Sequence, residues 1–139
     1  MKNIILSIFG LFLLFAQAAP VSANTVCSAG MIRNTYGYVG STIVQGPEGL
    51  MYCGVTGVFT FRLDGTAQGA LKQSCGGMLE SVKGTATYEV RPNCTATANV
   101  VFSDGDSATW HFTIVDGGKK LFFVGEQPGV TFTGTGEQL

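Results

Sequence analysis

The chain has 139 residues with 8 basic and 9 acidic side chains, and only 12% of its residues are charged, whereas 20 of them are glycine. Lys119 and Lys120 are the only adjacent cations, so the sequence offers no basic patch for phosphate backbones. This argues against nucleic acid and anionic membranes as partners. Abundant glycine and threonine are typical of short strands and tight turns.

The N-terminal segment has the order of a secretory signal peptide. Lys2 precedes an apolar run from Ile4 to Ala16, and Pro20-Val21-Ser22-Ala23 follows as a small-residue cleavage site. The run is shorter than the roughly 20 residues that a transmembrane helix needs. We therefore predict that residues 1–23 are removed and that 24–139 form a single secreted or periplasmic domain without a membrane span.

Eight runs of alternating or β-branched residues follow, and helical periodicity is absent. They lie at about 35–40, 55–63, 66–73, 84–90, 94–102, 107–115, 119–124 and 129–135. In the clearest run, Trp110, Phe112 and Ile114 alternate with polar side chains on the opposite face. This pattern predicts strands with one buried side.

Turn sequences separate these runs. They include Asp64-Gly65, Pro92-Asn93, Asp104-Gly105-Asp106 and Asp116-Gly117-Gly118. A two-residue turn at either 116–117 or 117–118 puts Phe112 and Ile114 on the same face as Leu121 and Phe123. Eight short antiparallel strands form either a sandwich or a barrel, and closure into a barrel removes exposed edges. We therefore predict an all-β fold, a small eight-stranded antiparallel β-barrel.

The four cysteines of an exported domain predict two disulfides. If the loop after Phe61 consists of the three residues 63–65, with Gly65 left-handed, facing residues have numbers that sum to 128, and Cys53 lies opposite Cys75. A two-residue turn would instead place the charge of Lys72 beside phenylalanines, which costs desolvation. The register set by the three-residue loop is therefore preferred. It predicts a disulfide between Cys53 and Cys75, and Cys27 and Cys94 then form the second disulfide.

Polar residues give no catalytic or metal site. His111, the only histidine, lies on the polar face of its strand and is expected at the surface, and Glu89 is expected in solvent. Asp104 and Asp106 lack the glutamate that ends a calcium loop, so a solvated turn is the better interpretation. We predict no metal and no cofactor, and catalytic residues remain unassigned.

Several motifs resemble a known family when they are taken together. They are Cys27-Ser28, Asn34-Thr35-Tyr36-Gly37-Tyr38, Gly57-Val58-Phe59-Thr60-Phe61 before Asp64-Gly65-Thr66, Gly84-Thr85-Ala86-Thr87-Tyr88-Glu89-Val90 before Arg91-Pro92-Asn93-Cys94-Thr95, and Val115-Asp116-Gly117-Gly118-Lys119-Lys120. Their order resembles the exported bacterial proteins of the allene oxide cyclase barrel-like family, over most of residues 27–135. The resemblance implies a lipocalin-shaped barrel with a central cavity.

The resemblance does not imply the cyclase reaction, because no stretch matches the active-site signature of the plant enzymes. The chain also departs from the bacterial pattern. Asn93 stands where an aspartate usually precedes the cysteine, and Cys53 and Cys75 are an additional pair.

The inward-facing aromatic residues form the candidate pocket. They are Tyr36, Tyr38, Phe59, Phe61, Tyr88, Trp110, Phe112, Phe123 and Phe132. An eight-stranded barrel has room either for packed side chains or for one small ligand. Inward positions are almost wholly apolar, without a charged residue on the assigned strands, which favours binding of a small hydrophobic molecule.

Two alternatives stay open beside the binding function. One is a cyclase or isomerase that uses the same cavity, and the other is a structural or surface-interaction role if the aromatics leave no cavity. Residues 41–52 are expected to be a loop, and we hypothesise that it acts as a lid over one barrel mouth.

Overall fold

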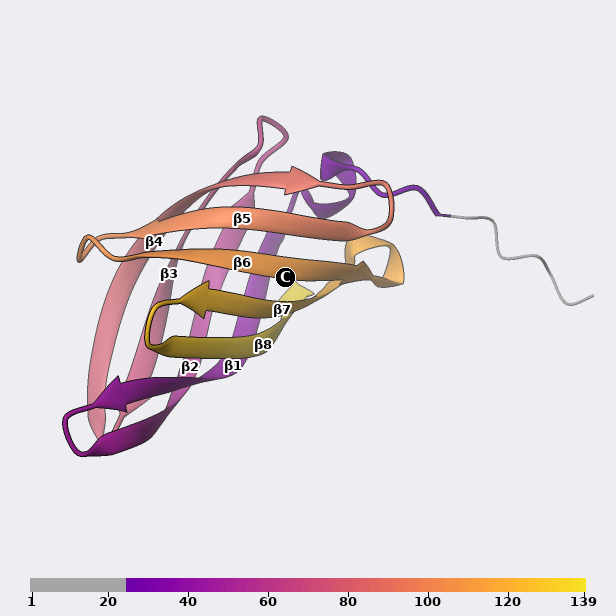
Figure 1. The fold of residues 1–139 in the computed structure, drawn as a ribbon. Coiled ribbons are helices and arrows are strands. Elements are labelled where there is room, and N and C mark those ends of the chain that lie inside the picture. Colours follow the sequence, from indigo (N-terminus) through magenta and orange to yellow (C-terminus); the bar gives the residue numbers. More distant parts are fainter. Residues whose placement is uncertain (1–24) are drawn as a thin grey trace, which may run out of the picture.

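The computed structural model describes residues 25–139 as a closed barrel of eight antiparallel strands (Figure 1). The elements in chain order are η1 (Ala29–Ile32), β1 (Thr35–Gly46), β2 (Gly49–Phe61), β3 (Thr66–Cys75), β4 (Met78–Val90), β5 (Thr95–Phe102), β6 (Ser107–Val115), η2 (Asp116–Gly118), β7 (Lys120–Gln127) and β8 (Val130–Gln138). Each strand pairs with the next, and β8 pairs with β1. The predicted fold class is confirmed, whereas the predicted signal peptide lies outside the described residues.

Both predicted disulfides are present. The loop of residues 63–65 has Gly65 at a φ of 79°, and its register places Cys53 opposite Cys75, to which it is bonded. Cys27 is bonded to Cys94 and thereby ties the N-terminal segment to the turn between β4 and β5. The predicted pairing follows from the left-handed glycine, because that one residue sets the register of the whole hairpin.

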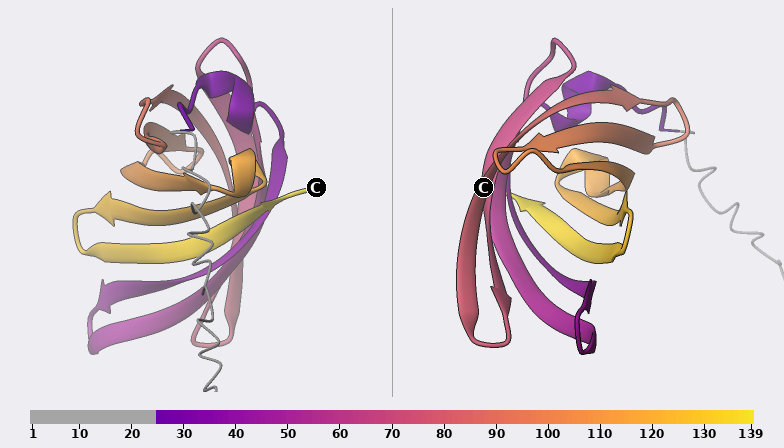
Figure 2. Two further views of the ribbon diagram at one scale, coloured as in Figure 1. Left: turned by 90° about the vertical axis from the view of Figure 1, so that its right-hand side faces the viewer. Right: turned by 60° about the vertical axis from the view of Figure 1, so that its left-hand side comes forward.

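The loop predicted for residues 41–52 does not exist, which is a correction to the lid hypothesis. β1 and β2 continue through this segment to the pair Gly46 and Gly49, so that only Pro47 and Glu48 form the turn. The reason is the alternation of side chains in this segment. Thr42 and Val44 line the inside of the barrel and Ile43 lies on the other face, as in any half-buried strand. β3 and β4 likewise run past their predicted ends. The β1–β2 hairpin and the β3–β4 hairpin extend beyond the other strands at one end of the barrel (Figure 2).

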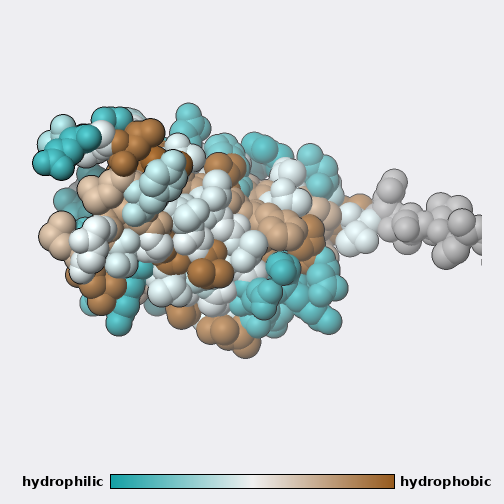
Figure 3. Space-filling model, turned by 90° about the horizontal axis from the view of Figure 1, so that it is seen from below, coloured by the Kyte–Doolittle hydropathy of each residue, from teal (hydrophilic) through white to brown (hydrophobic). Residues whose placement is uncertain are grey.

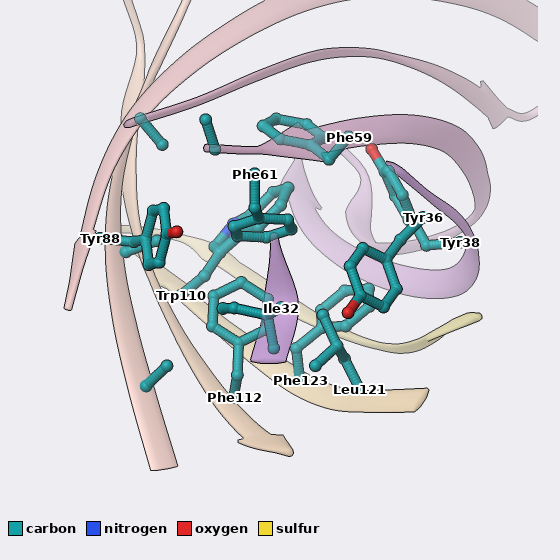
Figure 4. Packing of buried hydrophobic residues seen from close by; sticks show 14 of the residues in the cluster. Ile32, Tyr36, Tyr38, Phe59, Phe61, Tyr88, Trp110, Phe112, Leu121 and Phe123 are labelled. Atoms are coloured by element: carbon teal, nitrogen blue, oxygen red, sulfur yellow. The ribbon is translucent and has the colours of Figure 1, made fainter. Parts of the chain in front are cut away.

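The two ends of the barrel differ. One end, called the closed end below, is covered by η1, whose Ile32 is only 1% exposed (Figure 4). There the hydroxyl of Tyr36 donates a hydrogen bond to the Gly118 carbonyl, and that of Tyr88 donates one to the Arg62 carbonyl. The opposite end, called the open end, carries the turns at residues 47–48, 76–77, 103–106 and 128–129.

The hairpin between β6 and β7 has the predicted faces. Phe112 lies opposite Phe123, and Ile114 lies opposite Leu121, with all four side chains buried. The connection is longer than a two-residue turn, because Val115 pairs with Lys120 and η2 fills the space between them.

No helix within residues 25–139 is both long enough and apolar enough to cross a membrane. The outer surface in Figure 3 shows apolar side chains interspersed with hydrophilic ones. Single exposed apolar residues are ordinary on proteins and need no partner to explain them.

Candidate functional site

All nine candidate pocket residues point into the barrel and are buried. Trp110 is at the centre of this aromatic cluster, and its ring stacks on Phe123 with centroids 5.7 Å apart. Tyr38 has its ring within 6.4 Å of four others, those of Phe59, Trp110, Phe123 and Phe132. Figure 4 shows how the rings fill the barrel interior beside Ile32. The aromatic side chains therefore pack against one another over much of the barrel's length.

The packing stops short of the open end, where a cavity of about 200 Å³ remains. Its apolar wall includes Val55, Leu71, Phe102, Trp110 and Phe132, and its polar rim includes Gln73, Glu80, Asp104, Asp106 and Gln127. Of the nine candidate pocket residues, only Trp110 and Phe132 line this cavity. The other seven lie in the packed part of the barrel.

Some strands carry their large inward side chains at the closed end and smaller ones towards the open end. Going from the closed end to the open end, the inward residues of β6 are Ile114, Phe112, Trp110 and then Ala108. In β2, the two inward phenylalanines are followed by Gly57. On β5 the order is the reverse, from Ala96 and Ala98 at the closed end to Phe102 at the cavity, so residue size along one strand does not show where the cavity lies.

A charged side chain also lines the cavity, on a part of β4 that the sequence analysis did not assign to a strand. Glu80 occupies an inward position of β4, two residues before Val82, and both line the cavity. Sequence reasoning missed Glu80 because the predicted strand began at residue 84, and Glu80 belongs to the part of β4 that extends the hairpin. The Glu80 side chain remains exposed to solvent, so its charge carries no burial cost.

Two buried hydroxyl groups have no hydrogen-bond partner within the described part of the chain. They are Oη of Tyr38 and Oγ1 of Thr42. Thr42 is only 2% exposed, and it lines the cavity. An unpaired buried hydroxyl costs about 1–3 kcal/mol, and a polar group of a ligand in the cavity would recover that cost at Thr42.

Burial also changes the acidity of three tyrosines. It raises the pKa of Tyr36 to about 12, with a smaller contribution from Tyr88, and it raises the pKa of Tyr38 still further. For Tyr88 it raises the pKa, with a smaller contribution from the charge of Asp64. An unfolded tyrosine loses its proton near pH 10. The unfolded chain therefore binds fewer protons than the folded chain above that pH, so the free energy of unfolding falls as the pH rises from 10 towards 12.

We expect Tyr38→Phe to keep the protein folded at neutral pH, with a free energy of unfolding within about 1 kcal/mol of the parent, because it removes an unpaired hydroxyl. The same change makes the loss of stability above pH 10 shallower. Urea unfolding at a series of pH values measures both effects. Tyr52→Phe removes the hydroxyl of a side chain that is 73% exposed and is the matched control. If the free energy of unfolding of Tyr38→Phe falls above pH 10 as steeply as that of the parent, the raised pKa of Tyr38 is not a cause of the alkaline loss of stability.

The remaining polar candidates lie outside the cavity or hold turns. His111 is on the outer surface, where its Nε2 lies 3.8 Å from a carboxylate oxygen of Glu126, so the prediction of a surface histidine is confirmed. Asp104 accepts a hydrogen bond from the backbone N–H of Asp106. No group of three or more metal-ligating side chains occurs within residues 25–139.

These features define a closed β-barrel that is packed at one end and hollow at the other. No protein-family model matches the chain, and no curated protein sequence matches it either.

Solved structures of designed proteins share the fold. A redesigned β-barrel, mFAP1, bound to DFHBI is 16% identical with a TM-score of 0.60, over 80% of this chain and 98% of the other. A de novo fluorescence-activating β-barrel is 13% identical with a TM-score of 0.57, over 80% and 96%. A second redesigned barrel, mFAP0, also bound to DFHBI, is 13% identical with a TM-score of 0.57, over 78% and 99%. At these identities the likeness concerns the fold alone.

Proposed function

We propose that the protein is an exported barrel that binds one small, largely apolar molecule in the cavity at its open end. The observation that carries this proposal is the cavity itself. Its wall is built from apolar side chains such as Trp110 and Phe132, and the hydroxyl of Thr42 is buried there without a hydrogen-bond partner among residues 25–139. Apolar pockets with a few placed polar groups are the usual form of small-molecule sites.

Two further observations support the proposal. The designed barrels of similar fold include two that are bound to the small molecule DFHBI. The two disulfides are compatible with the oxidising environment that an exported protein meets. Membership of the allene oxide cyclase barrel-like family remains a prediction.

The alternatives are less well supported. A purely structural role was expected if the aromatics left no cavity, and they leave one. For a cyclase or isomerase, the acidic groups of the cavity lie at its rim, while its wall beside Trp110 is apolar. Within the described part of the chain, that arrangement places no acid or base at the bottom of the cavity, where a bound substrate would be shielded from water.

The proposal is tested by filling the cavity. Ala108 faces the cavity from β6, and the next residue, Thr109, has the outward position. We expect Ala108→Trp to abolish the fluorescence increase of N-phenylnaphthylamine, an uncharged hydrophobic dye, whereas Thr109→Trp keeps it. Val82→Phe blocks the same cavity from β4 and covers the case in which Ala108→Trp fails to fold.

Circular dichroism checks that each variant is folded. Absence of dye binding to the parent protein, or undiminished binding to folded Ala108→Trp and Val82→Phe, would remove the cavity from consideration as the ligand site.

A further inference from the structure

The cavity rim has an uneven charge. Among residues 25–139, three carboxylates line it, those of Glu80, Asp104 and Asp106, and no lysine, arginine or histidine does. Within residues 25–139, the ion pairs join His111 to Glu126 and Lys120 to Glu137, so none of the rim carboxylates is paired with a cation. The mouth therefore presents carboxylates that no ion pair within residues 25–139 engages.

No basic residue of the described chain lines the cavity, although Lys83 lies at the open end, where its backbone N–H donates a hydrogen bond of 3.2 Å to Oγ of Ser103, the neighbour of Asp104. On β3 and β4, Lys72 and Lys83 take outward positions, next to Leu71 and Val82, which face the cavity. The other cations of the described chain belong to the closed end or the segments beside it, and they are Arg33, Arg62, Arg91, Lys119 and Lys120. The negative potential at the mouth is thus a property of how the charges are distributed, although the net charge of the whole chain is only −1.

The carboxylates of Asp104 and Asp106 are held in place. Asp104 accepts the backbone N–H of Asp106 at 3.1 Å, and Asp106 accepts a hydrogen bond of 3.2 Å from Nε2 of Gln127 on the neighbouring hairpin. Acidic residues in a turn are usually no more than a solvated surface. Here they border a cavity that also contains the buried, unpartnered hydroxyl of Thr42, an independent sign that a ligand belongs there.

We propose that the ligand is an amphipathic organic cation, whose apolar body lies against Trp110 and Phe132 and whose protonated amine lies among the carboxylates of the mouth. This inference rests on the proposed function and specifies the class of ligand. The apolar wall supplies most of the affinity, and the carboxylates select the sign of charge and speed the approach of a cation. The ring faces of the wall also favour a positive group that enters deeper into the cavity.

Three ligands with the same bicyclic ring test the inference, because each carries one small polar group whose charge near pH 7 is different. Naphthylmethylamine is a cation, naphthalenemethanol is uncharged and naphthoate is an anion. Isothermal titration calorimetry at low salt, with both disulfides of the protein formed, is expected to give the tightest binding for the amine and the weakest for the acid. The Kd values of these two should differ by about tenfold or more, and added salt should reduce the difference.

A triple variant tests the assignment to residues. Glu80→Gln, Asp104→Asn and Asp106→Asn together keep the size of the side chains and retain an oxygen that can accept the hydrogen bonds of the turn. We expect this variant to bind all three ligands with Kd values within about twofold of the parent's value for the alcohol. Glu126→Gln is the matched control, because Glu126 lies on the outer surface at the same end of the barrel. It should keep the preference for the amine.

The outcomes separate this inference from the proposed function. If the three ligands bind equally to the parent protein, or if naphthoate binds most tightly, the charge selection is wrong while the cavity remains a ligand site. If Glu126→Gln loses the preference for the amine as fully as the triple variant does, the charge selection cannot be assigned to the three rim carboxylates. If the parent binds none of the three and does not bind the uncharged dye, the proposed function itself fails.

Discussion

Trp110→Ala is expected to lower the free energy of unfolding by about 4 kcal/mol, within the range found when large buried aromatic residues are truncated. The ring of Trp110 contacts six other aromatic rings, those of Tyr38, Phe59, Phe102, Phe112, Phe123 and Phe132. These rings come from β1, β2, β5, β6, β7 and β8, so the indole joins most of the barrel wall. Removal of the indole leaves a cavity. The surrounding strands cannot move in to fill it, because hydrogen bonds to their neighbours hold them in place.

Phe122→Ala is the matched comparison for this experiment. Phe122 is also on the β6–β7 hairpin, yet its side chain faces outward and is 45% exposed. Urea unfolding should therefore show a cost of less than about 1 kcal/mol for Phe122→Ala. Similar costs for the two variants would mean that the packing centred on Trp110 does not determine the stability of the barrel.

Removing the disulfide between Cys27 and Cys94 is expected to have an effect of similar size. The bonded residues are 67 positions apart, and a cross-link over a loop of that length stabilises a protein by about 4 kcal/mol through the entropy of the unfolded chain. The Cys53–Cys75 bond spans 22 positions, for which the same relation gives about 3 kcal/mol. Replacing each pair by alanine and measuring urea unfolding compares the two bonds.

The two disulfide variants should also differ in where the protein loosens. Without the bond at Cys27, the segment that places Ile32 over the closed end is tied down only by weaker contacts, such as the hydrogen bond from Cys27 N–H to the Pro92 carbonyl. Hydrogen exchange of the Met31 and Asn34 amides is therefore expected to become faster in that variant and to stay slow in the other. Equal exchange in both variants would contradict a local role for the bond.

Sequence reasoning worked best where a feature depends on neighbours along the chain. The left-handed position of Gly65 determines which residues of β2 and β3 face each other, and it led directly to the Cys53–Cys75 bond. Alternation likewise identified the inward face of β6 around Trp110. These inferences need only the geometry of one turn and the period of two residues in a strand.

The same reasoning failed at the tips of the long hairpins. Residues 41–52 contain glycine, proline and polar side chains, which are typical of a loop, but pairing with both neighbouring strands keeps them extended up to Gly46. Tertiary context thus overrides a weak local preference. Glu80 was missed for the same reason, since it lies on β4 beyond the part that looked like a strand.

The cavity could not be located from any single segment. Thr42, Glu80, Asp106 and Trp110 come from β1, β4, the β5–β6 turn and β6, and only the closure of the barrel brings them to one end. The sequence shows which side chains point inward, whereas their height along the barrel axis depends on the stagger of all eight strands. The nine aromatic residues were therefore predicted as one pocket, although most of them fill the packed part.

The order of the strands also bears on how the barrel assembles. Seven of the eight strand pairs join neighbours in the chain, and each can form as soon as its own hairpin is available. The eighth pair joins Thr35–Gly46 to Val130–Gln138, which are separated by nearly the whole domain. Long-range pairing of this kind carries the largest entropic cost, so we expect closure of the barrel to be the slow step in folding. Before β8 pairs with it, β1 has one edge with unpaired backbone N–H and C=O groups. A chain that lacks β8 should therefore aggregate rather than fold.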